Sequence, residues 1–155
     1  MRTKLAYMAA GALLMAMVAG GITIASASSK AGGTTTIKVT SKTTDFRGID
    51  EGPQGGGIGD EFVVRKSLSQ NGKWVGQEQM TCEAVFGGRA MCTAGFKFAK
   101  RGQIVTTAVV NLFPRVAQYN VPITGGSGEF KGARGQVLVT NPTKNTSELT
   151  FTLLT

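Results

Sequence analysis

The stretch KWVGQEQMTCEAVFGGRAMCTAGFKFAK, residues 73–100, has a clear β-hairpin pattern. It contains two runs, 73–86 and 90–100, in which apolar and polar residues alternate, with the pair Gly87-Gly88 between them. Alternation with a period of two is typical of half-buried β-strands, and a glycine pair between two such runs indicates a reversal. We therefore predict an antiparallel hairpin that turns at Gly87.

The two cysteines of the chain fit this hairpin. Cys82 and Cys92 each lie five residues from Gly87, so they should face each other across the two strands. Directly opposed residues of antiparallel strands lie ~4.5–5.5 Å apart, which is within reach of a disulfide. An even number of cysteines favours pairing in an oxidising compartment. We predict a Cys82–Cys92 disulfide.

The alternation gives the hairpin one apolar and one polar face. The apolar face carries both cysteines together with Met80, Phe96 and Phe98. The pattern leaves open whether this face is turned towards the protein interior or outwards.

Similar runs continue along the chain in both directions. They are rich in Val, Thr, Ile and Phe, and they lack the 3.6-residue apolar period of an amphipathic helix. The eight predicted strands are 35–46, 60–70, 73–86, 90–100, 103–113, 116–124, 134–140 and 147–155. Several short strands at a spacing of about ten residues predict an all-β sandwich or barrel, and composition does not choose between the two.

Two connections have distinctive sequences. Asn71-Gly72 predicts a type I′ hairpin turn, and counting from it places Glu78 opposite Arg65, as an exposed ion pair worth only ~0.2–1 kcal/mol. Residues 48–59, GIDEGPQGGGIG, contain six glycines and one proline, which excludes a strand interior. This segment is either a flexible connection between the first two strands or a mobile flap over one mouth of the fold.

The N-terminus has the pattern of a secretory signal peptide. Arg2 and Lys4 precede an apolar run over residues 5–24, and Ala25-Ser26-Ala27 provides an A-x-A cleavage site. We predict a signal peptide over residues 1–27, a disordered leader over 28–35 and a secreted protein without stable membrane insertion. The alternative is an uncleaved anchor, because 20 apolar residues can cross a bilayer.

Charge and composition exclude several function classes. Residues 1–27 contain two of the 17 basic residues and none of the 9 acidic ones, so the mature chain has a net charge of +6. Its basic residues are scattered without a stacking motif, which argues against nucleic-acid binding. The absence of histidine and the presence of only two thiols argue against a metal site, and a serine nucleophile would lack its base.

Further along the chain, residues 125–135 (GGSGEFKGARG) resemble the GGTGxFxxARG signature of dirigent proteins and are equally similar to the corresponding segment of allene oxide cyclases. Residues 59–64 (GDEFVV) and 75–79 (VGQEQ) match the same families in the same order, as does the closing stretch 147–154. The resemblance covers residues 36–155 and implies an eight-stranded antiparallel up-and-down β-barrel. The motif glycines should permit a tight crossing between strands, with Phe130 plugging one barrel end: Gly125, Gly126, Gly128, Gly132 and Gly135.

The resemblance also implies a function. Allene oxide cyclases fold an apolar epoxide inside the barrel, and dirigent proteins hold phenoxy radicals while they couple. We therefore expect a hydrophobic small-molecule ligand, an isomerase- or cyclase-type activity that acts by positioning, and no cofactor. A non-catalytic carrier or an extracellular interaction module is the alternative. Related barrels associate as trimers, and a homotrimer through the face around Phe96 and Phe98 is an expectation.

The resemblance assigns some positions of this chain to pocket residues of the cyclases. Cys82 falls on the pocket cysteine of the cyclases and Lys66 on their pocket asparagine, whereas their strand-one glutamate has no counterpart at Lys38, Thr40 or Lys42. These departures argue against the cyclase reaction itself. The polar side chains that we select as candidates for the site are Asp45, Glu61, Lys66 and Glu83.

Overall fold

The computed structural model describes residues 33–52, 54–112, 117–141 and 143–154. The predicted signal peptide lies outside these residues, as does most of the predicted leader. Within them the first strand already begins at Thr34, two residues before the predicted start of the barrel domain. No helix long and apolar enough to cross a membrane occurs in the described part of the chain.

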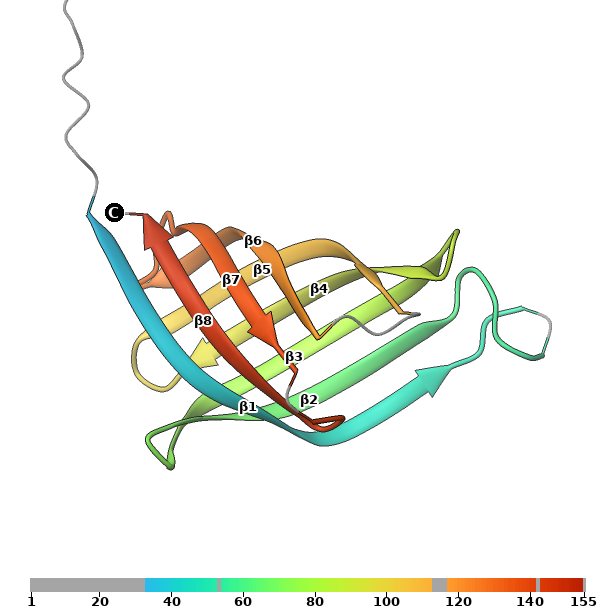
Figure 1. Ribbon diagram of the computed structural model, residues 1–155, viewed down its shortest axis with the longest axis horizontal. Coiled ribbons are helices and arrows are strands. Elements are labelled where there is room, and N and C mark those ends of the chain that lie inside the picture. The colour runs from blue at the N-terminus through green and yellow to red at the C-terminus, as the bar shows by residue number, and fades with distance from the viewer. Residues whose placement is uncertain (1–32, 53, 113–116, 142, 155) are drawn as a thin grey trace, which may run out of the picture. The chain divides into compact units, whose positions relative to one another are not determined.

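Eight antiparallel strands form one closed barrel (Figure 1). Each strand pairs with its neighbours in sequence, and the first pairs with the last, from Thr34 opposite Leu154 onwards. This confirms an up-and-down barrel and decides against a sandwich. The strands are β1 (Thr34–Ile49), β2 (Glu61–Gln70), β3 (Lys73–Val85), β4 (Arg89–Phe98), β5 (Gly102–Asn111), β6 (Gln118–Gly128), β7 (Arg134–Thr140) and β8 (Thr146–Leu154).

The two hairpins predicted around β3 are confirmed. Asn71 and Gly72 have φ of 52° and 74°, the two positive values that a type I′ turn requires. The reversal between β3 and β4 is centred on Gly87, and Cys82 lies directly opposite Cys92. The predicted disulfide joins these two residues, whose Cα atoms are 4.1 Å apart.

The predicted partner of Glu78 is wrong. The register counted from the Asn71-Gly72 turn holds only as far as Ser69 opposite Trp74, after which Leu68 pairs with Gly76. Val75 is therefore an extra residue in β3, a β-bulge that shifts every later pair by one. As a result Lys66, and not Arg65, lies opposite Glu78.

The apolar face of the β3–β4 hairpin is turned into the barrel. Phe96 and Phe98 are only 4% and 3% exposed, so the expectation that they form a surface between copies of the chain is wrong. Their rings contact Phe151, with centroid distances of 5.0 and 5.7 Å. These three rings belong to a larger cluster of buried apolar side chains, which come from facing strands and exclude water from this part of the barrel.

Phe130 closes this packed end, as predicted from the glycine motif. It is 4% exposed, its ring centroid lies 5.2 Å from that of Phe98, and the Arg101 guanidinium lies over its outer side at 5.1 Å. Gly126 allows the closure, because a Cβ at this position would come within 2.5 Å of the Phe130 carbonyl oxygen. β6 runs on through Gly128, four residues beyond the predicted end of this strand, because these glycines let it pass close to β5.

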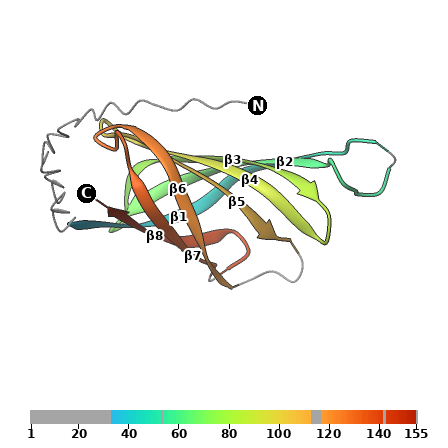
Figure 2. The ribbon, with the colours of Figure 1, turned by 90° about the horizontal axis from the view of Figure 1, so that it is seen from above.

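The glycine-rich segment 48–59 is partly strand. Contrary to the prediction, Gly48 and Ile49 belong to β1, where they pair with Phe62 and Glu61. The loop that follows returns through Asp60, whose carboxylate accepts hydrogen bonds from the backbone N–H groups of Gly57 (2.6 Å) and Glu51 (3.1 Å). Figures 1 and 2 show this loop at the same end of the barrel as the β3–β4 turn, opposite the end at which β6 connects to β7.

Candidate functional site

A cavity of about 620 Å³ opens at the end of the barrel opposite Phe130. Its lining comes from the parts of the strands that meet at this end, for example Phe46 near the end of β1, Phe62 at the start of β2 and Leu112 just after β5. A much narrower extension leads inwards past Ala94 to Phe96, where the packed half begins. The barrel is therefore open at one end and packed at the other. We call the open half the cup, and Phe96 lies at its inner end.

One wall of the cavity is apolar. The Cys82–Cys92 disulfide lies on it, and the rings of Phe46 and Phe62 stack at its rim with centroids 6.0 Å apart. Phe46 as a residue stays 62% exposed, which leaves a large apolar surface at the mouth. The remaining apolar side chains of the lining are Val64, Met80, Val110 and Leu112.

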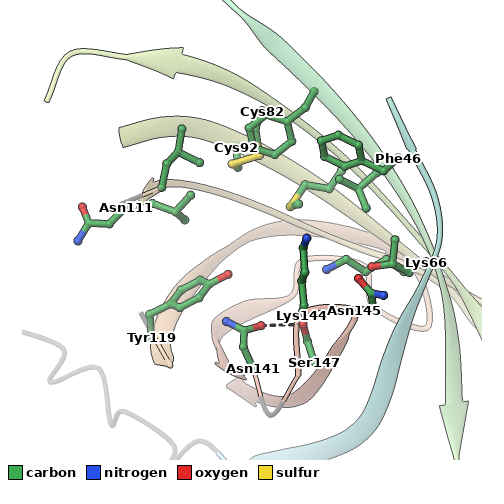
Figure 3. A pocket seen from close by; sticks show the side chains of 16 residues that line it. Phe46, Lys66, Cys82, Cys92, Asn111, Tyr119, Asn141, Lys144, Asn145 and Ser147 are labelled. Atoms are coloured by element: carbon green, nitrogen blue, oxygen red, sulfur yellow. Dashed lines mark hydrogen bonds between the residues drawn. A yellow bond between two sulfur atoms is a disulfide. The ribbon is translucent and has the colours of Figure 1, made fainter. Parts of the chain in front are cut away.

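The opposite wall is polar and is built largely by the connection between β7 and β8 (Figure 3). Ser147 Oγ donates a hydrogen bond of 2.8 Å to Asn141 Oδ1, which fixes the orientation of that amide. The Tyr119 ring, from β6, lies beside Asn141, and the Lys144 side chain extends into the open space between the walls. Thr43, Asn111 and Asn145 also contribute polar groups to the lining.

A charged cluster lies where the cavity narrows, because Lys66 lines both the open cavity and its narrow extension and Glu78 lines the extension. Glu78 is 2% exposed, and its Oε1 lies 3.2 Å from Lys66 Nζ. Ser41 Oγ donates a hydrogen bond of 2.5 Å to Glu78 Oε2. The side chains of Lys66 and Glu78 are 14% and 3% exposed, so Lys66 stands between the carboxylate and the open cavity.

Three strands bring this cluster together. Lys66 on β2 and Glu78 on β3 are a directly opposed pair, and Ser41 on β1 points into the barrel from the other side of β2. Inside a protein an ion pair is stable only when hydrogen bonds also satisfy the remaining oxygen atoms, and Ser41 supplies that bond. Among the described residues no buried side-chain polar atom lacks a partner.

Of the side chains selected from the sequence, the structure places Lys66 in the cavity. Glu61 and Glu83 oppose each other on the outer face of β2 and β3, because their neighbours in sequence point inwards. Asp45 is opposite Arg65, and its carboxylate lies 4.0 Å from the Arg47 side chain. None of these three carboxylates belongs to the described lining of the cavity.

Sequence reasoning missed Glu78 and Ser41. The signal for Glu78 was present, because it alternates in step with Met80 and Cys82 on the apolar face of the hairpin. Counting residues from the Asn71-Gly72 turn instead placed Glu78 in an exposed pair with Arg65, because the count could not include the bulge at Val75. Ser41 lies between Thr40 and Lys42, in a stretch whose polar residues gave no sign of which ones face inwards.

The described residues contain no cluster of three or more His, Cys, Asp or Glu side chains.

No protein-family model matches the sequence, and no curated protein matches it. Solved structures share its fold. A pyocyanin demethylase superposes with a TM-score of 0.65 at 23% identity, over 78% of this chain and 100% of its own. The Diels–Alderase AbmU from Streptomyces koyangensis gives 0.66 at 17% identity, over 81% and 70%. A pterocarpan synthase dirigent protein gives 0.59 at 15% identity, over 79% and 94%. The likeness to the dirigent barrel is thus confirmed at the level of the fold.

Proposed function

We propose that this chain is an exported barrel protein that binds a hydrophobic small molecule in its open cavity and guides the cyclisation or coupling of that molecule. The observation that carries the proposal is the cup itself, with an apolar wall facing a polar one and a buried Lys66–Glu78 pair at its narrow end. In this proposal the walls of the barrel determine the conformation of the bound molecule, and the polar side chains determine its orientation.

The size and lining of the cavity support binding of a small molecule. Its volume of about 620 Å³ lies within the ~300–1,000 Å³ of pockets that hold drug-sized ligands. Such pockets are mostly apolar, with a few polar groups that set the orientation, which is also the composition of this lining. A flexible ligand that enters must fold to fit, because Phe96 closes the way inwards.

Positioning is the form of catalysis that this lining favours. Holding two reacting parts of one molecule at ~3–3.5 Å contributes roughly 7–11 kcal/mol to lowering a barrier, without any covalent step on the protein. Both cysteines of the cavity are bonded to each other in the disulfide, so they offer no thiolate nucleophile. Barrels with the same fold include proteins named as a Diels–Alderase and as a pterocarpan synthase, and these names support a role in ring formation.

Filling the cavity tests the proposal. Val110 and Val109 are neighbours on β5, but Val110 lines the cavity and Val109 lies on the outer face at 50% exposure. We expect Val110→Trp to weaken binding of an apolar fluorescent probe at least tenfold, and Val109→Trp to leave it unchanged. Equal binding by the two variants would place the probe elsewhere and refute the proposal.

Turnover separates a catalyst from a carrier. Native mass spectrometry of the purified protein identifies a bound molecule. Incubation with unreacted polyenes, or with phenols together with an added one-electron oxidant, reveals any conversion. A cyclised product, or a single stereoisomer of a coupled product, that forms with the wild type and not with Val110→Trp supports catalysis by positioning. A bound molecule that is released unchanged would instead support the non-catalytic carrier.

A further inference from the structure

We propose that Lys66 is a nucleophile that forms a reversible imine with an aldehyde or ketone bound in the cavity, and that Glu78 carries the protons of this reaction. The proposal rests on the proposed function and adds a covalent step to catalysis by positioning. Its basis is the arrangement of Lys66, Glu78 and Ser41, which sequence reasoning did not reach.

These three side chains form a row of directly contacting polar groups. Lys66 Nζ lies 3.2 Å from Glu78 Oε1, and Glu78 Oε2 accepts a hydrogen bond of 2.5 Å from Ser41 Oγ. A nucleophile in contact with a base, which is itself held by a third group, is the arrangement that activates weak nucleophiles in enzymes. Lysine amines act as such nucleophiles towards carbonyl compounds. The row therefore has the order nucleophile, proton carrier and orienting group.

The nucleophile is the member of the row that a ligand would meet first. Lys66 lines both the open cavity and its narrow extension, whereas Glu78 lines the extension, and their side chains are 14% and 3% exposed. Val64 and Met80 are the next inward-facing residues towards the mouth, and they oppose each other on β2 and β3. A carbonyl group at the inner end of the cup would thus lie beside the amine, with the apolar body of the ligand against these two side chains.

Packing alone does not account for the ion pair. Apolar side chains of similar volume in place of a buried ion pair are often neutral or stabilising, so such a pair is weak evidence for a role in stability. A lysine attacks a carbonyl carbon only as the neutral amine, and it therefore needs a proton acceptor within reach. The Glu78 carboxylate is such an acceptor, and its contact with Ser41 keeps it aimed at Lys66.

The atoms and charges of the reaction balance within this row. Glu78 takes a proton from Lys66, and the nitrogen lone pair forms a C–N bond as the C=O π electrons move to oxygen. Proton transfers through Glu78 convert that oxygen to water, which leaves as the C=N bond forms. An ammonium and a carbonyl have then become an iminium ion and one water molecule. Glu78 is a carboxylate before and after, so the buried cation is paired at the start and at the end.

The iminium ion would assist ring formation in a bound molecule. It withdraws electrons from the neighbouring carbon atoms more strongly than a neutral carbonyl does, which makes them more reactive towards another part of the same molecule. A covalent intermediate of this kind divides one difficult step into easier ones. Hydrolysis by water from the open mouth releases the product and restores Lys66, with no net oxidation or reduction. The substrate class that this site would take is therefore aldehydes and ketones.

Reductive trapping with 2-naphthaldehyde and cyanoborohydride at neutral pH tests the inference. The hydride donor reduces an iminium ion to a stable secondary amine, so each lysine that forms an imine gains a naphthylmethyl group. We expect intact-mass spectrometry to show a single label on the wild type, and peptide mapping to place it on Lys66. Lys97, exposed on the outer face of β4, should be labelled at least ~tenfold more slowly.

Two variants locate the label in the cavity. Val110→Trp should slow the labelling of Lys66 and leave that of Lys97 unchanged, because only the cavity is filled. Lys66→Met/Glu78→Gln should lose the rapid label altogether, and it leaves no buried carboxylate unpaired.

Glu78→Gln tests the role of the carboxylate. The slow step of imine formation at neutral pH is the loss of hydroxide from the tetrahedral adduct, which needs an acid. If Glu78 supplies that proton, the labelling rate of Lys66 falls at least ~tenfold in the variant. A higher rate would show that Glu78 only holds the ammonium in its charged form, and the proton-carrying role would be wrong.

A second probe separates this inference from the proposed function. Calorimetry with 2-naphthylmethanol, which has the same apolar body and no carbonyl group, measures binding alone. If the wild type binds it and Val110→Trp does not, but the aldehyde labels Lys144 or surface lysines in place of Lys66, the imine is wrong and the ligand cavity stands. If the wild type neither binds the alcohol nor labels Lys66, both conclusions fall.

Discussion

Glu78 is a carboxylate inside a barrel whose interior is otherwise largely apolar, and its stability depends on two neighbours. Lys66 and Ser41 each engage one of its oxygens, at 3.2 and 2.5 Å. Removing one member of a buried pair is costly because the other charge stays in a medium that solvates it poorly. Single and double substitutions in this cluster should therefore differ in their effect on the free energy of unfolding.

We predict that Lys66→Met lowers the free energy of unfolding by about 3–5 kcal/mol, because it leaves the Glu78 carboxylate buried without its counter-ion. Lys66→Met/Glu78→Gln should be closer to the wild type, since a neutral amide oxygen still accepts from Ser41. Urea denaturation measures both.

Glu129 provides the control for these substitutions at Lys66 and Glu78. Its pair with Arg101 lies at the surface, with side chains 55% and 44% exposed, so Glu129→Gln should cost less than about 1 kcal/mol. If Lys66→Met costs no more than Glu129→Gln, the pair inside the barrel is not the desolvated one described above.

Two adjacent glycines of the motif differ in what surrounds them. A Cβ at Gly126 would lie 2.5 Å from the Phe130 carbonyl oxygen and 2.8 Å from that of Gln103, whereas a Cβ at Gly125 meets nothing within 4 Å. Neither residue has a positive φ. The two positions therefore isolate crowding from backbone conformation.

We predict that Gly126→Ala destabilises the protein by about 1–3 kcal/mol through overpacking at the closed end, and that Gly125→Ala is neutral or slightly stabilising. Thermal or urea unfolding of the two variants checks this. Equal stability of the two would show that the closed end can relax around an added methyl group.

Among the strands, β3 determines most of what the cavity contains. Its bulge at Val75 sets the pairing of Glu78 with Lys66, and its alternation places Met80 and Cys82 on the same inner face. A shift of one residue in the register between β2 and β3 would put Arg65 opposite Glu78. The pairing of Lys66 with Glu78 inside the cavity thus depends on one extra residue, Val75, in the β2–β3 hairpin.

The disulfide fastens β3 to β4 at the mouth of the cup. Because the closed loop is short, with a sequence separation of 10, we predict that Cys82→Ala/Cys92→Ala lowers the free energy of unfolding by about 2–3 kcal/mol. Reduction of the wild type should have a similar effect, and the double variant should not respond to reductant. Thiol titration of the native protein that found two free thiols would contradict the bond.

For the molecule as a whole, the barrel closes without the N-terminal segment. β1 begins at Thr34, and its first residue already pairs with β8. We predict that the exported chain begins at Ser28 and that a chain lacking residues 1–27 unfolds at the same temperature as the full chain. Mass spectrometry of the exported protein and circular dichroism measure these two quantities. An intact Met1 would instead support the uncleaved anchor.

The homotrimer stays a prediction, and its expected surface has to change. Phe96 and Phe98 are inside the barrel, so a contact between copies has to use other, exposed side chains. Sedimentation at several concentrations tests the assembly directly.

Three features could be predicted from the amino-acid sequence: the class of the fold, most strand boundaries to within a few residues, and the disulfide. These are local properties: alternation follows from the geometry of one strand, and the opposition of Cys82 and Cys92 follows from a turn five residues away. The resemblance carried by the glycine motif added barrel closure, which no single strand encodes.

Which face of each strand points inwards, and which charged side chains share the cavity, became known from the three-dimensional structure. Ser41, Lys66 and Glu78 come from three strands, and their meeting depends on closure and on a bulge that adds one residue to a single strand. A one-residue change of register moves every side chain to the other face, so no local pattern can place them. The site therefore follows from register, which is set by the packing of the whole barrel.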